Sequence, residues 1–289
     1  GASTINGTLM FGGSGNMGNV SGFTLNGNLA KTGSGTITCN AARSVGGNVT
    51  VSSGVLYAQY GINVTGTTTI SGTGTLQLGN QSSGTGTFTG DFSISAGTFN
   101  SSFGGQNPAV SFGGNLTVSG GTFTAGTGAH TFSGTGKTIT GTISIPSLTV
   151  SGTITNASAL TVSTTLAGPG TLTQGANSTL NIAAASVTPT LDALSNTPNT
   201  VNYNRANTQT VKSTTYDNLT LSAGNTKTLA GAATVNSTLT IAASTTLAPT
   251  TPPETAATTA VVEYRALDAT FGAEAVIEAE RQSTVSAQV

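Results

Sequence analysis

The chain is poor in the side chains that most proteins use for chemistry and for electrostatic binding. Its 289 residues include no tryptophan, one cysteine and one histidine, and only 6% are charged, with a net charge of −1. A typical soluble domain has roughly 25% charged residues. This neutrality excludes a nucleic-acid binder, which needs a basic surface for the phosphates. The single cysteine, Cys39, excludes an intrachain disulfide and is expected to be a small buried apolar side chain.

Catalytic groups are equally scarce. Between residues 1 and 247 the only acids are Asp91, Asp192 and Asp217, each isolated in sequence. Enzymes that cleave polysaccharides bring carboxylates together, and the sole histidine, His130, has no neighbours for a metal site or a serine–histidine–aspartate relay. We therefore expect no enzyme, no cofactor and no metal, with Asp91 at a corner and His130 at a surface turn. No apolar run is long enough to span a membrane.

Gly, Ser and Thr are abundant, which makes disorder the competing interpretation. Disorder of the usual kind accompanies high net charge and few β-branched residues. Here Val, Ile and Thr recur on a fixed grid, which favours a folded chain.

A repeated motif supplies that grid. The segment 46–56, GGNVTVSSGVL, returns as GGNLTVSGGTF at 113–123. Between the copies the register is regular, with Val64, Phe88 and Phe112 each 24 residues apart, and likewise Ile70, Ile94 and Val118. Such a period predicts units whose apolar face is buried only by stacking on neighbours.

Each unit consists of short runs that alternate apolar and hydroxyl residues. The clearest are 23–25, 36–38, 49–51, 68–70, 92–94 and 116–118, separated by Gly, Asn and Asp that suit tight corners. No helical period is visible to cover a flat parallel sheet. The sequence therefore predicts an all-β fold, a parallel β-helix (β-solenoid), with a short non-repetitive C-terminal segment.

Stacking at the 24-residue register predicts an internal ladder rather than a sugar-binding aromatic platform. Seven of the ten phenylalanines fall at 88, 92, 99, 103, 112, 123 and 132. The predicted core ladder comprises Val64, Phe88, Phe112, Ile70, Ile94, Val118, Phe99 and Phe123. Asn48 and Asn115 share one position of the repeat, which predicts a stacked amide ladder at a corner, although each also begins a glycosylation triplet.

The later part of the chain is less regular. After Pro146 similar triplets at 148–150, 160–162 and 172–173 step by 12 residues, and residues 186–210 are expected to form an irregular insertion or corner. Residues 218–222 and 238–242 then correspond at a spacing of 20. These patterns divide the chain into a solenoid body (1–247), a Pro/Thr-rich linker (248–260) and a segment (261–289).

The final segment differs in composition, with five of the nine acids at 263, 268, 274, 278 and 280. It is too short to hold a core of its own and is expected to pack on the solenoid or on a neighbouring subunit. The residues expected to mediate assembly are Val261, Val262, Tyr264, Leu267, Phe271, Val276 and Ile277.

The stretch 216–231, YDNLTLSAGNTKTLAG, followed by TVNSTLTI at 234–241, resembles the repeats of bacterial secreted and cell-surface β-solenoid proteins of the adhesin and autotransporter-passenger kinds. The resemblance covers most of residues 3–247. It implies a long parallel β-helix at the cell surface or outside the cell, mediating adhesion or building extracellular fibres.

We therefore expect a structural subunit of an extracellular fibre or surface appendage, assembling as a homo-oligomer or homopolymer through solenoid ends and the C-terminal segment. An adhesin that binds surface glycans is the main alternative. Thr-x-Thr pairs, such as Thr153/Thr155 and Thr171/Thr173, also raise ice binding, but the unequal coil steps argue against an even lattice.

Overall fold

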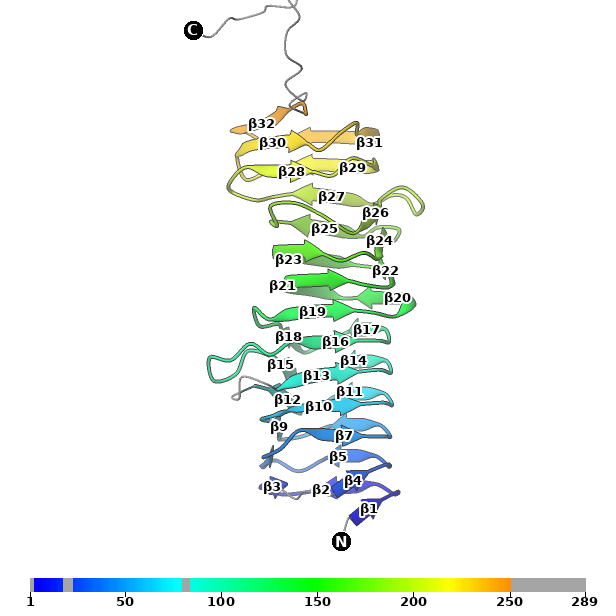
Figure 1. The fold of residues 1–289 in the computed structure, drawn as a ribbon, viewed down its shortest axis with the longest axis vertical. Helices are drawn as coiled ribbons and strands as arrows, with labels where there is room; N and C mark the ends of the chain where they lie inside the picture. The colour runs from blue at the N-terminus through cyan, green and yellow to red at the C-terminus, as the bar shows by residue number, and fades with distance from the viewer. Residues whose placement is uncertain (1–2, 18–22, 80–83, 251–289) are drawn as a thin grey trace, which may run out of the picture. The chain divides into compact units, whose positions relative to one another are not determined.

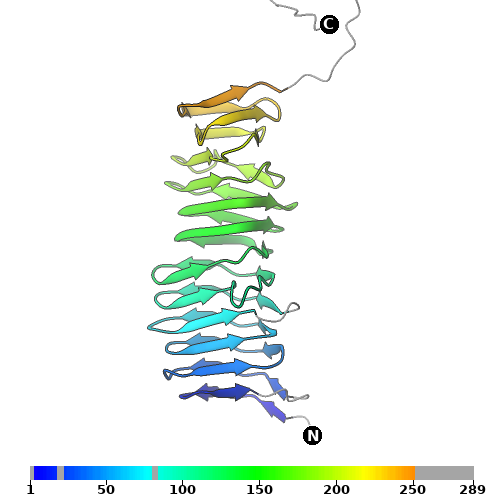
Figure 2. The same ribbon diagram turned by 90° about the vertical axis from the view of Figure 1, so that its left-hand side faces the viewer.

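The computed structural model describes residues 3–17, 23–79 and 84–250, and within these ranges it contains strands, turns and no helix. The strands wind into a parallel β-solenoid of about 12 turns, which confirms the predicted fold class (Figures 1 and 2). Residues 1–250 form one compact unit.

Sheet A contains 13 strands and runs from the first described coil to the last. In spatial order it comprises β1 (Ser3–Ile5), β4 (Phe23–Leu25), β7 (Arg43–Val45), β10 (Gly61–Val64), β13 (Thr85–Phe88), β16 (Val110–Phe112), β19 (Ala129–Phe132), β21 (Thr142–Val150), β23 (Ala159–Ala167), β25 (Thr179–Ile182), β27 (Thr200–Tyr203), β29 (Thr215–Leu221) and β31 (Thr234–Ile241).

Three further sheets complete the coils. Sheet B comprises β2 (Leu9–Phe11), β5 (Leu29–Lys31), β8 (Val49–Val51), β11 (Thr68–Ile70), β14 (Phe92–Ile94), β17 (Leu116–Val118), β20 (Thr135–Thr140), β22 (Thr153–Asn156), β24 (Thr171–Gln174) and β26 (Thr190–Asp192). Sheet C comprises β3 (Gly15–Met17), β6 (Thr36–Cys39), β9 (Val55–Ala58), β12 (Thr75–Leu78), β15 (Thr98–Asn100) and β18 (Thr122–Thr124), and sheet D comprises β28 (Gln209–Val211), β30 (Asn225–Leu229) and β32 (Thr245–Ala248).

The 24-residue register holds in the middle of the solenoid. Phe88 pairs with Val64 below it and with Phe112 above it, and Ile94 pairs with Ile70 and Val118 in the same way. Like side chains therefore form columns, which is how short strands without a helical cover can bury their apolar positions.

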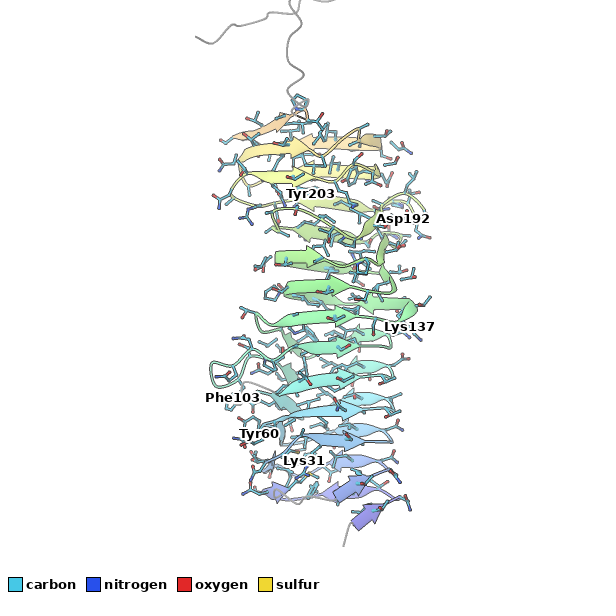
Figure 3. The ribbon with its side chains drawn as sticks, viewed as in Figure 1. Lys31, Tyr60, Phe103, Lys137, Asp192 and Tyr203 are labelled. Carbon is cyan, nitrogen blue, oxygen red and sulfur yellow. The ribbon has the colours of Figure 1, made fainter. Side chains whose placement is uncertain are left out.

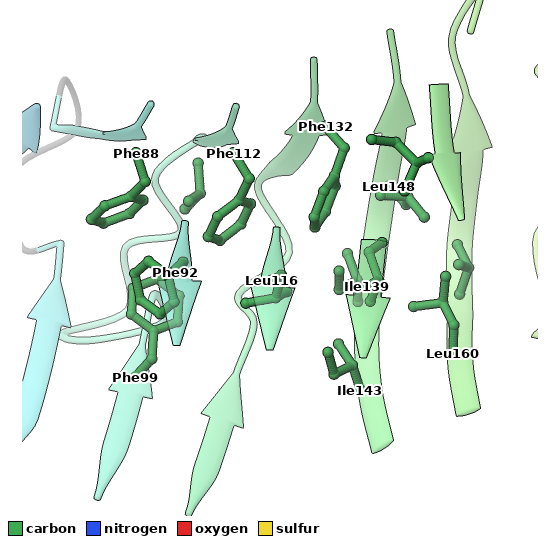
Figure 4. Close-up of a cluster of buried hydrophobic side chains, with 14 of the residues drawn as sticks. Phe88, Phe92, Phe99, Phe112, Leu116, Phe132, Ile139, Ile143, Leu148 and Leu160 are labelled. Carbon is green, nitrogen blue, oxygen red and sulfur yellow. The ribbon is translucent and has the colours of Figure 1, made fainter. Parts of the chain in front are cut away.

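The phenylalanines of these columns form one cluster (Figure 4). The Phe88 and Phe112 rings stack with centroids 5.7 Å apart, and Phe132 continues the stack 4.9 Å from Phe112. Phe92 and Phe99 meet the stack edge-on, the geometry that aromatic quadrupoles favour.

The boundary of the predicted ladder differs from expectation in three places. Val118 and Phe123 pair as expected with Ile94 and Phe99 but are only half-buried, because they lie where the coil path changes. Phe103 is 38% exposed and packs edge-on against Tyr57 instead of joining the interior. It lies in the loop between β15 and β16, outside the alternation that points side chains inward.

Close rung stacking explains the glycines at the corner before sheet C. Gly97 adopts a φ of 78°, and a Cβ there would lie 2.2 Å from the carbonyl oxygen of Gly74 in the rung below. Gly121 repeats this arrangement one coil later, above Gly97. The corner therefore needs glycine both for its backbone conformation and for the space.

The coil path changes at β21 and β23, which are the longest strands of the solenoid (Figure 2). β18 of sheet C contacts β21, and β21 belongs to sheet A, so the columns of sheets A and C continue into one sheet. A corner disappears here, and the register shortens from 24 residues to the 18 between Ile154 and Leu172.

This change corrects two expectations. Leu148 pairs with Leu166, whereas Leu160 pairs with Leu180 and Leu172 lies in sheet B, so there is no 12-residue coil step. Similar triplets occur on different faces of one coil, and sequence similarity alone cannot distinguish those faces. Residues 186–210 are also not an insertion, because they contribute β26 and β27 to the regular sheets.

Replacing Phe112 with alanine should lower the free energy of unfolding by about 3–5 kcal/mol, because the ring is 1% exposed and contacts several other rings. The matched control is Phe103→Ala, which removes the same ring from an exposed site and should cost about 1 kcal/mol. Urea unfolding followed by circular dichroism measures both values. Equal losses for the two variants would contradict the described core.

Candidate functional site

The three acids of the described solenoid do not converge. Asp91 precedes β14, Asp192 ends β26 and Asp217 lies in β29, so they belong to separate rungs. Lys137 and Asp192 lie along one edge of the solenoid in Figure 3, also on separate rungs. Within residues 3–17, 23–79 and 84–250 there is no cluster of three or more histidine, cysteine or acidic side chains that could hold a metal ion.

Asp91 is part of the predicted corner ladder. The side-chain oxygen of Asn48 accepts the Thr67 N–H at 2.8 Å, that of Asp91 accepts the Asn115 N–H at 2.8 Å, and that of Asn115 accepts the Thr138 N–H at 2.9 Å. The Asn115 backbone N–H lowers the pKa of Asp91 by stabilising its carboxylate. The ladder joins successive rungs, which is a structural role.

Asp192 and Asp217 also bind backbone groups. Burial opposes ionisation of Asp192, but hydrogen bonds from Ser195 and Leu194 outweigh it and lower the pKa of the carboxyl. Asp217 accepts the Asn199 N–H at 2.9 Å and the hydroxyl of Ser237. Each carboxylate therefore satisfies turn donors that would otherwise lack a partner.

His130 is not at a surface turn, as the sequence suggested, but fully buried in β19. Its Nδ1 donates to the Gly128 carbonyl oxygen at 2.9 Å, so Nε2 is free to accept the hydroxyl of Ser101 at 3.0 Å. The Ser101 Oγ in turn accepts the Gly126 N–H at 3.0 Å. His130 occupies the position of Val110 in the preceding rung, which makes it an inward side chain.

A serine hydroxyl bonded to a neutral imidazole is the nucleophile–base pair of acyl transfer. Ser101 and His130 are both 0% exposed, so a substrate has no path to either group. The pair instead ties the end of β15 to the loop that precedes β19. The sequence offered no signal for this contact, because the two residues are 29 positions apart.

Other buried polar groups are likewise internal. The Tyr203 and Tyr216 hydroxyls are 3.0 Å apart, and Tyr216 donates to the Lys212 carbonyl oxygen at 2.6 Å. Burial raises the pKa of both phenols, which keeps them protonated. Cys39 is buried as expected, and burial raises the pKa of its thiol to about 11, so it is not a reactive nucleophile.

One shallow depression interrupts the outer face of sheet A, with a volume of ≈ 240 Å³. It is lined by Thr85, Gly86, Thr87, Ala109, Val110, Ser111 and Thr131. The outward positions Ala109 and Ser111 have small side chains here, whereas Gly86 is an inward position whose added Cβ would meet the Leu78 side chain. Its lining holds hydroxyls but no titratable group, so it offers no acid or base for catalysis.

The C-terminal end of the described solenoid has an incomplete region, which we call the open rung: the inward positions Leu239 and Ile241 of β31. They are 45% and 44% exposed, whereas their register partners Leu219 and Leu221 are 2% and 0% exposed. Within the described residues no strand pairs with the far side of β31. An unpaired strand edge beside apolar side chains favours docking of another strand.

The residues expected to mediate assembly, 261, 262, 264, 267, 271, 276 and 277, all lie outside the described residues. The sequence did not single out Leu239 and Ile241, because their triplet repeats the buried one at 219–221. The only sequence feature that indicated the end of the solenoid was the proline-rich stretch that follows β32.

Comparison with protein-family models, curated proteins and solved structures finds no match. The evidence for the repeat architecture is therefore the structure itself. The resemblance to bacterial surface proteins remains an expectation about function. No helix in the described ranges has the length and apolar character needed to cross a membrane.

Buried His130 should make the solenoid sensitive to mild acid. Burial lowers the pKa of His130 below its usual 6.5, so the unfolded chain binds the proton more readily than the folded one. Stability is then complete above pH 6.5 and falls as the pH drops below that value. Thermal melts between pH 8 and pH 5 measure this slope, above the range in which aspartates titrate.

The matched variant is His130→Leu, which places an apolar side chain at the position that Val110 and Leu148 occupy in adjacent rungs. Because His130 is the only histidine, its removal should flatten the melting temperature across this pH window. A wild-type slope that persists in the variant would contradict a buried neutral imidazole.

Proposed function

We propose that this protein is a structural subunit of an extracellular fibre or cell-surface appendage, which assembles through the open rung and the C-terminal segment. The exposure of Leu239 and Ile241 carries the proposal. These two side chains have the inward orientation of a core column but lack the next rung above them. A strand from another copy would bury them and complete the backbone hydrogen bonds of β31.

The chemistry of the body supports a passive role. Its described acids bind turn backbone, its histidine and tyrosines are buried, and Lys31 and Lys227 are buried with their Nζ atoms donating to the carbonyl oxygens of Gly33 and Arg205. Each coil pairs with the next through parallel strands, so the described body presents an extended surface of stacked rungs.

The C-terminal segment supplies a second element for assembly. The segment 261–289 has 29 positions, which exceed the 20 between Leu219 and Leu239 in one coil. The run Val261–Leu267 alternates like a strand. Such a segment, from the same or a neighbouring copy, is suited to covering the open rung.

The central test compares two aspartate variants of β31. The double variant Leu239→Asp/Ile241→Asp places charges where the next rung must dock and should abolish filaments seen by electron microscopy, because burying unpaired carboxylates is costly. The matched control Thr238→Asp/Thr240→Asp puts the same two charges on the outward side of the same strand and should leave filaments intact. Wild-type protein that stays monomeric at all concentrations would contradict the proposal.

Deletion of Val261–Val289 separates the two elements. Loss of filaments with unchanged β-sheet circular dichroism would support a role for the segment in assembly. Unchanged filaments after the deletion would contradict that role and leave the open rung as the docking element.

Glycan binding is a second candidate, favoured by two exposed aromatic rings. Tyr60 is 36% and Phe103 38% exposed, and Figure 3 shows both along one edge of the solenoid. Aromatic faces are suited to stacking on sugar rings, although Phe103 already packs against Tyr57.

A glycan array probed with wild-type protein and with Tyr60→Ala/Phe103→Ala tests this candidate. The expected result for an adhesin is a set of hits that the double variant loses. An array without hits, or hits retained by the variant, would contradict glycan binding at these rings.

A further inference from the structure

The upper part of sheet A carries a two-column array of small uncharged side chains on its outer face. Successive strands from β21 to β31 each contribute two outward positions, and none of these residues is buried. We call this the hydroxyl–amide array; its first column is Thr142, Ala159, Thr179, Thr200, Asn218 and Thr238, and its second is Ser144, Thr161, Asn181, Asn202, Thr220 and Thr240.

The array is in register from rung to rung. Neighbouring strands in a sheet are about 4.7–4.9 Å apart, and residues two apart along a strand are separated by roughly 6.6 Å. Thr179 pairs with Thr200 and Asn181 with Asn202, so these two spacings repeat across the face. The result is a rectangular grid of side chains rather than a pocket.

The side chains of the grid are held in place. Asn202 Nδ2 donates to Asn181 Oδ1 at 3.0 Å, and the Ser222 hydroxyl donates to Asn202 Oδ1 at 2.8 Å. The threonines are β-branched and restricted at χ1, which fixes their methyl and hydroxyl groups relative to the strand. Little side-chain entropy is therefore lost when a flat partner binds.

The grid contains no charged side chain and no aromatic ring. The adjacent carboxylate, Asp217, is only 4% exposed and is bonded to Asn199 and Ser237. Tyr60 and Phe103, the exposed aromatic rings of the described surface, belong to the lower coils. This composition and spacing favour an uncharged, periodic partner.

The unequal coil lengths do not disturb this face. Coils in this part differ by up to four residues, with 17 positions from Thr142 to Ala159 and 21 from Thr179 to Thr200. The differences fall in the connections between sheets and in two strand irregularities, between Ile145 and Ser147 and between Tyr216 and Asn218, and the outward columns keep their pairing. The coil steps in the sequence had argued against ice binding, but on this face the unequal steps leave the pairing of the outward residues unchanged.

We propose that the hydroxyl–amide array binds ice. Its hydroxyl and amide groups would each anchor a water molecule, and the two strand spacings would arrange these waters in a regular two-dimensional lattice. The threonine methyl groups fill the space between anchored waters. An ordered layer formed in this way can merge with a growing crystal face.

The test uses the full chain and two pairs of tyrosine substitutions. Thr200→Tyr/Thr220→Tyr places bulky rings inside the array, whereas the control Thr50→Tyr/Thr117→Tyr places them at outward positions of sheet B. Partitioning of protein into slowly growing ice and the shape of single ice crystals are measured, with circular dichroism to verify folding. Wild type and control should enter the ice and facet the crystals, and the array variant should lose both effects.

Absence of wild-type protein from the ice fraction would overturn the proposal, as would equal partitioning of the two double variants. If the array variant misfolds, the single substitution Thr240→Tyr at the exposed end of the array replaces it. Two other partners have their own readouts. A change of sedimentation coefficient specific to the array variant would assign the face to lateral contacts between copies. Retention of the protein on insoluble chitin or cellulose would assign the face to a neutral polysaccharide. Either result without ice partitioning would overturn ice binding, and none bears on filament formation.

Discussion

The burial of each inward side chain by the same position of the rungs above and below is the constraint on which the rest of the structure depends. A single coil of three-residue strands cannot form a core, since each strand places only about two side chains inward. Phe88 is fully buried because Val64, Phe92 and Phe112 surround it, and Leu239 is exposed because its column ends there. The same side chain thus stabilises the interior of the solenoid and, at an end, creates a surface that favours association.

This constraint also explains where polar groups occur. Corner positions use Asn48, Asp91 and Asn115 interchangeably, because each supplies an oxygen that accepts a backbone N–H from the next rung. Inward polar residues are accepted only with internal partners, as Ser101 and His130 show. Within the described coils, Asp91, Asp192 and Asp217 bind backbone groups of the solenoid itself, and many outward positions carry hydroxyl and amide side chains.

The sequence was sufficient to predict the solenoid, the register of the central coils and the corner ladder, since these depend on spacings that are constant over several repeats. It was insufficient where different faces carry similar triplets. Leu148, Leu160 and Leu172 share a local pattern, but only tertiary pairing assigns them to their columns. Burial of His130 was missed because a lone histidine has no periodic partner, and the exposure of Ile241 depends on what lies above it rather than on its own segment.

The direction of the backbone hydrogen bonds has a mechanical consequence. In a solenoid the strands lie across the long axis, so the bonds between β10, β13 and β16 point along it. Tension applied between the ends would load one rung interface at a time and peel coils from the stack, whereas a strand pulled along its own length would load all its bonds in shear. A rod built in this way lengthens stepwise under load, with each released coil absorbing work before the next interface yields.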